Sequence, residues 1–503
     1  MSKKERNFIS KDATIEEIRS DKGFLGHPKG VGALAFGNFF NSAAWGAFYA
    51  IMIFYLYTPY THGLGFPEGT AAQMITAMGA CNGLFVIMGS WLADRVLGMR
   101  KSLIIGNIVK GTGFLLLAIP PVSLIQGRIF AIIALFLLAL PIMGASNASL
   151  TGQLYSKQDN GRRDAAFTIH QFANTIAGII TPIIVGQIGM SNFHIGFGIA
   201  AFFAFLYGAV IFITQHKFFG YLGENPVKPL PKGALKKIGL RAFVITVIVG
   251  VLIFGLIYGK LIGLQGFLNV ITSATFIIPI LFLTNLFKQT DLTDADRRHM
   301  KPFMKLFCAQ ILIALGGTLL TSAIAIFIDQ KINREILGFE IAPGSVPTIY
   351  TVLGLIIAPI FVYLWTNTKA QNIPIVKKYA CGIFTTSVAF GVLTIPTIFL
   401  AGSAPYSMWW LVIYYVFMAL SDQLVWPIGS SMVSKLAPDA YETQMQTAWG
   451  QTAAISNGIA LVLFNFFKTP DQQVYLFPIM AVVLLLTVIY LLVNAKKIEA
   501  EMN

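Results

Sequence analysis

The chain has 503 residues, of which 56% are apolar and only 12% are charged, and its mean hydropathy is +0.71. A soluble globular protein has no interior large enough for so apolar a chain, so the composition excludes that class and predicts an integral membrane protein. The net charge of +14 would suit nucleic-acid binding, but most Lys and Arg fall in segments expected to face the cytoplasm, so we expect no nucleic-acid partner.

The segment 1–29 is charged and lacks an apolar stretch followed by a cleavage site, so we expect a cytoplasmic tail and not a signal peptide. Apolar stretches of about 20 residues or more, enough to cross a hydrocarbon core of roughly 30 Å, follow it. The expected spans lie near 31–58, 68–93, 102–121, 129–155, 165–189, 193–215, 238–259, 265–287, 302–329, 346–367, 378–401, 407–436, 442–467 and 472–495.

These spans predict an all-α membrane protein of about fourteen helices, arranged as six, two and six. We expect a first bundle at 30–216, a cytoplasmic linker with an inserted two-helix hairpin at 217–300, a second bundle at 301–496 and a cytoplasmic tail at 497–503. Both chain ends are then cytoplasmic, and we expect the inserted helices only to pack on the side of the bundles.

The most informative motif is Gly89-Ser-Trp-Leu-Ala-Asp-Arg-Val-Leu-Gly-Met-Arg-Lys-Ser102, a basic turn between the second and third spans. It resembles the cytoplasmic loop between helices two and three of major facilitator transporters. Its Ala-Asp-Arg followed by Gly-x-Arg-Lys-Ser resembles the proton-coupled oligopeptide transporter family. The resemblance continues at Gly152–Tyr155, Arg162–Phe167, Pro182, Phe327–Arg334, Ala358–Trp365, Ser421–Gly429, Lys435–Pro438, Trp449 and Asn457.

This resemblance implies a major facilitator fold, with two six-helix bundles plus two extra helices and a substrate site near mid-membrane where the halves meet. The first span departs from the family pattern, which typically has Glu-x-x-Glu-Arg, a cluster implicated in proton coupling. Here the segment reads Asn38-Phe-Phe-Asn-Ser42. Asn38, Asn41 and Ser42 do not titrate, so we expect a substrate site rebuilt without that relay. The alternative is simple helix packing through Asn and Ser.

Other charges of the family pattern are also replaced. A later arginine of the first helix aligns with Tyr49, the fourth-helix lysine with or near Gly144, and the seventh-helix acid near Thr318. In the family the basic groups are thought to meet the peptide carboxylate, so the resemblance implies that this clamp is absent. Neutral donors, which form weaker hydrogen bonds than charged ones, would replace it. The candidates are Tyr49, Asn147, Gln171 and Asn174.

Ionisable residues within spans are costly and therefore functional candidates. Asp422, near the middle of its span, resembles the family's tenth-helix glutamate, to which a substrate amino group is thought to bind; the alternative is a structural aspartate. For Lys110 we favour a snorkelling amine or a structural ion pair over a ligand role. Asp422 and His170 are the candidates for proton coupling, although a histidine at a helix end is more often structural.

The motif turn supplies candidates for conformational gating. Asp94, Arg95, Arg100 and Lys101 can form charge pairs that lock one arrangement of the halves and release it in the other. The alternative role is positive-inside anchoring.

Aromatic and amide side chains complete the expected substrate site. Trp45, Trp426 and Trp449 are expected to line it, with Asn457 as a polar neighbour. Apolar packing is the alternative for each of the aromatic residues.

The chain has no Gly-x-x-x-x-Gly-Lys-Ser/Thr, His-Glu-x-x-His or Cys-x-x-Cys motif, so we expect no enzyme activity, cofactor or metal site. The leading interpretation is a monomeric plasma-membrane transporter, secondary active or facilitative, that moves di- and tripeptides or peptide-like small molecules by alternating access, with protons as a candidate coupled ion. Two alternatives remain: a transporter of a non-peptide, amine-bearing molecule, and a non-transporting peptide-binding receptor or scaffold.

Overall fold

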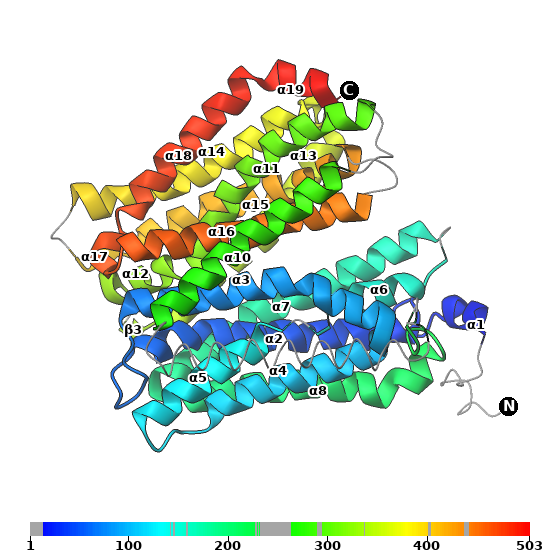
Figure 1. Cartoon of the computed structure of the whole chain (residues 1–503), viewed down its shortest axis with the longest axis horizontal. Coiled ribbons are helices and arrows are strands. Elements are labelled where there is room, and N and C mark those ends of the chain that lie inside the picture. Colours follow the sequence, from blue (N-terminus) through cyan, green and yellow to red (C-terminus); the bar gives the residue numbers. More distant parts are fainter. Residues whose placement is uncertain are drawn as a thin grey trace. The chain divides into compact units, whose positions relative to one another are not determined.

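The computed structural model describes residues 14–502 except 141, 144–145, 157–158, 227–228, 230, 232–262, 289–293, 337, 401–403 and 437–441. Helices dominate these residues (Figure 1). In chain order the α-helices are α1 (Ile15–Ser20), α2 (Lys29–Tyr57), α3 (Glu68–Leu92), α4 (Met99–Ala118), α5 (Leu124–Leu138), α6 (Ser146–Gln153), α7 (Asn160–Ser191), α8 (Phe193–Phe219), α10 (Leu264–Phe287), α11 (Asp294–Leu320), α12 (Ala323–Lys331), α13 (Thr348–Asn367), α14 (Ile375–Thr394), α15 (Trp409–Leu436), α16 (Glu442–Phe466), α17 (Pro470–Gln473), α18 (Leu476–Val493) and α19 (Ala495–Met502).

Short elements lie between the long helices. Two are π-helical, η2 (Ala93–Leu97) and η5 (Ile395–Phe399), and two are 3₁₀ helices, η3 (Pro343–Ser345) and η4 (Lys369–Asn372). Among the described residues the strands are two residues long: β1 (Ile332–Asn333) pairs in parallel with β4 (Tyr406–Ser407), and β2 (Glu335–Ile336) pairs antiparallel with β3 (Phe339–Glu340).

Within the described part of the chain, 11 helices are long and apolar enough to cross a membrane. The predicted class, an all-α integral membrane protein, is therefore confirmed. The span expected at 238–259 lies outside the described residues, and so does Gly144, on or near which the resemblance places the family lysine.

Two predicted spans contain a break in the helix. The stretch 129–155 includes most of α5 and all of α6, and the backbone between them turns at Ile142 and Met143. The sequence has Pro141 there, which lacks the N–H that a continuing helix requires. The stretch 302–329 is interrupted between α11 and α12, where the Ser322 hydroxyl donates to the Thr318 carbonyl at 2.7 Å. Such bonds from serine to its own helix backbone favour a bend.

The chain divides into two compact units. The first consists of Met1–Met52 and Phe85–Phe267, and the second of Ile53–Leu84 and Leu268–Asn503. The end of α2 (Ile53–Tyr57) and most of α3 therefore belong to the second unit. The bundle boundaries expected from the sequence stay a prediction.

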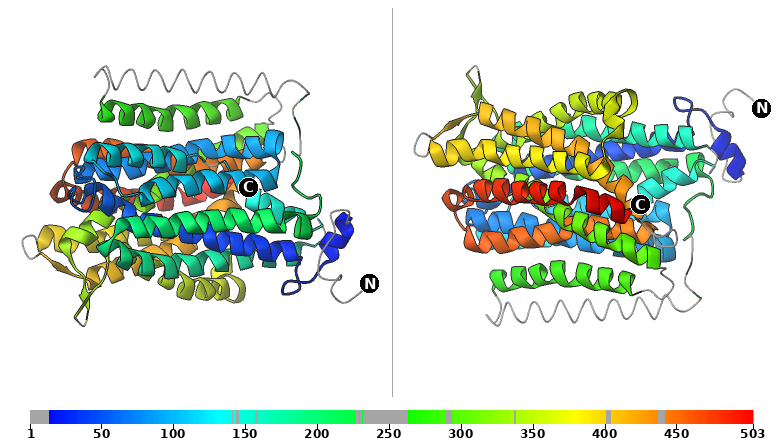
Figure 2. Two further views of the ribbon diagram at one scale, coloured as in Figure 1. Left: turned by 90° about the horizontal axis from the view of Figure 1, so that it is seen from below. Right: turned by 90° about the horizontal axis from the view of Figure 1, so that it is seen from above.

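In the first unit α4 packs along α8 and α5 (Figure 1). Asn192 caps the start of α8, because its side-chain oxygen accepts hydrogen bonds from the backbone N–H groups of His194 and Ile195 at 2.9 and 3.3 Å. In the second unit α14 packs against α15 and α18, and α11 against α16. Helix α10 runs along the outside of this second unit (Figure 2).

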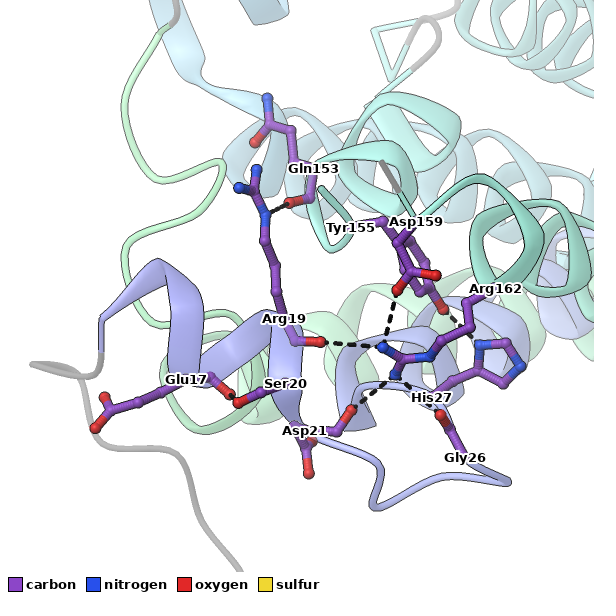
Figure 3. Close-up of polar contacts among 10 residues, drawn as sticks. All are labelled: Glu17, Arg19, Ser20, Asp21, Gly26, His27, Gln153, Tyr155, Asp159 and Arg162. Atoms are coloured by element: carbon purple, nitrogen blue, oxygen red, sulfur yellow. Dashed lines mark hydrogen bonds and ion pairs between the residues drawn. The ribbon is translucent and has the colours of Figure 1, made fainter. Parts of the chain in front are cut away.

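The segment before α2 is fastened to the start of α7 by Arg162 (Figure 3). The Arg162 guanidinium donates to the backbone oxygens of Arg19 at 3.4 Å, Asp21 at 3.2 Å and Gly26 at 2.9 Å. It also forms an ion pair with Asp159 at 2.9 Å. Its fixed fork of donors suits several acceptors at once, so one side chain contacts three residues of the segment 14–28.

Two further contacts hold the same segment. Ile18 is buried in an apolar cluster with residues such as Leu34, Leu103 and Leu150. The His27 Nδ1 and the Tyr155 hydroxyl form a hydrogen bond of 2.7 Å (Figure 3). Burial and the neighbouring Arg162 lower the pKa of His27, so the neutral ring is the form that this arrangement favours.

We expect Arg162→Gln to release the segment 14–28, because glutamine lacks the charge and the forked donors that hold the three carbonyl oxygens. Trypsin cleavage after Arg19 and Lys22 should become roughly tenfold faster, as expected when charged hydrogen bonds that oppose local opening are lost. Limited proteolysis followed by mass spectrometry measures this rate. Arg163→Gln is the matched control, and equal rates in the two variants would contradict the role of Arg162.

Candidate functional site

One face of α2 in the first unit carries the polar and aromatic residues singled out in the sequence. Asn38, Asn41, Trp45 and Tyr49 follow one another at intervals of three or four residues, which places them on one side of a helix. None of the four is buried, and Tyr49 is 41% exposed. The Trp45 and Tyr49 rings stack with centroids 5.7 Å apart. These four predicted residues thus form one accessible stripe on α2, and their role in binding substrate stays a prediction.

The stripe is connected to α7 and α4 by two side-chain hydrogen bonds. The Ser42 hydroxyl donates to the Asn174 side-chain oxygen of α7 at 2.9 Å. The Lys110 ammonium of α4 donates to the side-chain oxygen of Asn41. Lys110 is only 5% exposed, so the expectation of a snorkelling amine is wrong, and no acidic partner forms an ion pair with it among the described residues.

Asn147 extends the polar contacts within the first unit. Its amide nitrogen donates to the Tyr207 hydroxyl of α8 at 2.5 Å, and Lys110 lies 6.0 Å from the centroid of the same ring. The ring reaches this position because α2 has Gly37 beside it: a Cβ at Gly37 would lie 2.0 Å from Tyr207 Cε2. Tyr207 and Gly37 were not predicted as site residues.

His170 and Gln171 occupy opposite environments on α7. His170 is buried, hydrogen-bonded to the Val31 backbone, and packed edge-on against Phe167. Its Nε2 has no hydrogen-bond partner among the described residues. Gln171 is exposed, as a residue that contacts a ligand must be. The structural alternative for His170 accounts for its burial and packing.

In the second unit, Asp422 of α15 accepts a hydrogen bond from the Tyr350 hydroxyl of α13. Trp426, one helical turn further along α15, is 52% exposed and also hydrogen-bonds to Asp422. Asp422 itself is partly exposed. A carboxylate held by a tyrosine and a tryptophan in the middle of a long apolar helix can attract a positively charged group. Tyr350 was missed because nothing in the sequence places α13 beside α15.

Asn457 and Thr318 also meet in the second unit. The Thr318 hydroxyl donates to the Asn457 side-chain oxygen at 2.9 Å, so Thr318, near which the resemblance places the family acid, has a neutral partner. Trp449 is only 4% exposed and packs against Phe303, Phe307 and Tyr379. This placement favours the packing alternative for Trp449 over a lining role.

The motif turn is a helical continuation of α3 and not an open loop. Asp94 and Arg95 lie in η2, where Asp94 is exposed. The chain then turns at Gly98 with φ 79°, and a Cβ there would lie 2.6 Å from the Glu224 backbone oxygen, so glycine is required twice over.

Arg100 is buried, whereas a gating residue at the surface would be exposed. It is 1% exposed, forms an ion pair with Glu224 at 2.9 Å, and donates to the Gln215 backbone oxygen at 2.8 Å. These contacts tie the start of α4 to the end of α8 within the first unit. Lys101 is exposed beside a groove of about 340 Å³ that Arg100 and Glu224 also line.

Sequence inspection missed one further polar cluster of the second unit, at the junction of α12 and β2. Asp329 accepts hydrogen bonds from the Tyr57 hydroxyl and, at 3.3 Å, from Arg334. Arg334 also pairs with Glu340 at 3.1 Å. The sequence marked Phe327–Arg334 as a family signature without giving Asp329 a partner. No group of three or more metal-binding side chains occurs among the described residues.

Long apolar helices in two units, each with polar side chains held in mid-helix, are the architecture of a membrane solute transporter. Residues 100–482 match the model of the POT family. Over most of its length the chain is similar to an uncharacterized transporter, YclF, of Bacillus subtilis, with 29% identity over 93% of this chain and 94% of that protein. It is similarly related to a di-/tripeptide transporter of Lactococcus lactis, with 28% identity over 95% of this chain and 97% of that protein.

Solved structures agree with these relatives. A peptide transporter POT in complex with sulfate superimposes with a TM-score of 0.91 at 27% identity, covering 98% of this chain and 100% of that one. A POT family transporter in complex with 5-aminolevulinic acid has a TM-score of 0.87 at 25% identity, covering 95% and 98%. The protein therefore belongs to the POT family, and it has the major facilitator fold predicted from its sequence.

We expect Gly37→Ala to destabilise the first unit by about 1–3 kcal/mol, because the added methyl group overlaps the Tyr207 ring and forces a shift in a packed region. Gly354→Ala in α13 is the control, since a Cβ there meets nothing within 4 Å. Thermal unfolding of the two purified variants measures the difference. A Gly37→Ala variant as stable as the control would contradict the close approach of α2 to Tyr207.

Proposed function

We propose that this protein transports di- and tripeptides, or small molecules that resemble them, across the membrane by alternating access. Its membership in the POT family and its full-length similarity to a di-/tripeptide transporter support transport over the receptor or scaffold alternative. Its similarity to a POT family transporter that binds 5-aminolevulinic acid supports a small, zwitterionic ligand.

The observation that carries this proposal is Asp422. Its carboxylate lies in the middle of α15, is partly exposed, and has Tyr350 and Trp426 as neutral partners. A carboxylate in such a place without a basic partner among the described residues is suited to bind a cation from outside the chain. We assign it to the positively charged amino group of the substrate.

The polar residues of the first unit are the remaining candidates for contact with the substrate. Asn38, Asn41, Trp45 and Tyr49 form the accessible stripe of α2, and Gln171 and Asn174 lie on α7. Trp426 and Asn457 are the corresponding candidates in the second unit. Trp449 supports the second unit by packing, and Asn147 supports the first unit through its hydrogen bond to Tyr207.

Proton coupling has to differ from the usual family arrangement if it is present. Asn38, Asn41 and Ser42 cannot carry a proton. Transport is then passive, or it is coupled through Asp422 or His170. Asp94, Arg95 and Lys101 remain candidates for conformational gating, while the contacts of Arg100 with Glu224 and Gln215 support a structural contribution.

We further propose that the protein lies in the plasma membrane as a monomer with both chain ends in the cytoplasm. The distribution of Lys and Arg along the sequence supports this orientation. Accessibility of a cysteine introduced near either end to a membrane-impermeant reagent tests it in intact cells.

Uptake into liposomes that contain the purified protein tests the proposed function. We expect labelled dipeptide to enter faster than into protein-free liposomes, with unlabelled tripeptide competing. An inward proton gradient distinguishes passive from coupled transport. Accumulation against the peptide gradient that persists in both Asp422→Asn and His170→Gln would exclude both proposed coupling sites, and equal entry with and without protein would contradict transport of peptides.

We expect Asp422→Asn to weaken dipeptide binding by about 10- to 100-fold, because a charged hydrogen bond to the amino group is replaced by a neutral one. Isothermal titration calorimetry of the purified protein measures this change. Asp471→Asn is the control, since its side chain is 80% exposed and pairs with Lys331 at 2.7 Å. Unchanged affinity in Asp422→Asn would remove Asp422 from the substrate site.

A further inference from the structure

Lys110 is a buried cation in the first unit whose contacts are neutral. It lies near the middle of α4, is 5% exposed, and donates to the side-chain oxygen of Asn41. The Tyr207 ring centroid is 6.0 Å from its Nζ. Among the described residues no carboxylate pairs with it. A buried charge is costly unless it is paired, so an anion that approaches this region is attracted.

The contact fixes the orientation of the Asn41 amide. A lysine ammonium has three donors and no acceptor, so only the amide oxygen can face it. The amide nitrogen is therefore turned away from Lys110. Asn41 is partly exposed on the same stripe as Asn38, Trp45 and Tyr49, and its nitrogen has no acceptor among the described residues. Asn41 thus presents a hydrogen-bond donor.

The amide of Asn174, on α7, is oriented by a hydrogen bond in the same way. The Ser42 hydroxyl donates to the Asn174 side-chain oxygen at 2.9 Å, and the amide nitrogen of Asn174 has no acceptor among the residues that the structure describes. Asn174 is partly exposed as well. Two amide nitrogens are then accessible, and the one on Asn41 has the positive charge of Lys110 behind it. The ligand group that suits such donors is an anionic acceptor such as a carboxylate.

We propose that Lys110 is a positioning and specificity-determining residue that makes this transporter prefer substrates with a carboxylate. It orients Asn41 as a donor and supplies the positive charge behind it. This inference rests on the proposed function, since it concerns the same substrates. This role of Lys110 would also allow the neutral side chains on α2 to bind an anionic group. The positive charge lies on α4, directly behind Asn41.

The experiment compares two ligands that differ only in this group, alanyl-alanine and its C-terminal amide, which lacks the carboxylate. Binding of both to the purified full-length protein is measured by calorimetry. We expect the wild type to prefer the acid by about tenfold or more, the effect of one charge-assisted hydrogen bond. Lys110→Met should lose the preference, and Lys110→Arg should retain most of it. Lys369→Met, which removes an exposed lysine of η4, should leave it unchanged.

Asn41→Asp gives an independent variant of nearly the same shape. Its carboxylate pairs with Lys110 and removes both the amide donor and the unpaired charge, so the preference for the acid should again disappear. A purely structural role for Lys110 would lower thermal stability without changing the ratio of the two affinities. An acid preference that stays at the wild-type value in folded Lys110→Met or Asn41→Asp overturns the proposal. Wild-type protein that binds neither ligand contradicts the proposed function itself.

Discussion

A polar side chain inside a membrane-spanning helix needs a partner on its own helix or on a neighbouring one, because the hydrocarbon offers none. The described structure satisfies this constraint with pairs of side chains. Lys110 meets Asn41, Ser42 meets Asn174, and Asp422 meets Tyr350. Each pair joins two helices of one unit, so the same contacts that satisfy the polar groups also position them. The candidate site is a consequence of how the helices pack.

The fold could be predicted to a large extent because membrane spans have a strong signal, a run of apolar residues of fixed minimum length. Most helices lie close to their expected positions, as α2 and α16 do. Breaks within a span were harder to predict. The sequence has Pro141 before α6, and a proline within a predicted helix is a visible signal for a break. The break at Ser322 has no such signal, because it depends on a side chain that bonds to its own helix backbone. That choice is made by the packed environment.

The candidate site was predictable only in part, for the same reason. The family resemblance and residue type selected Asn38, Asn41, Trp45 and Tyr49, and their spacing of three or four residues places them on one face of a helix. The partners could not be predicted, because they come from distant parts of the chain. The structure was needed to recognise these partners, because it shows which helices lie beside α8, α13 and α4. They are Tyr207, Tyr350 and the buried ammonium of Lys110. Trp449 shows the reverse case, since its type suggested a ligand contact and packing explains its position.

This POT family member lacks the usual charged first-helix cluster, and we propose that it still carries peptides across a membrane. Counterflow tests this most directly, because exchange needs both binding and a complete transport cycle but no coupled ion. Liposomes containing the protein are loaded with unlabelled dipeptide and diluted into a trace of labelled dipeptide. We predict transient accumulation of label inside the liposomes. Binding of the dipeptide without any counterflow would contradict the claim and favour a receptor.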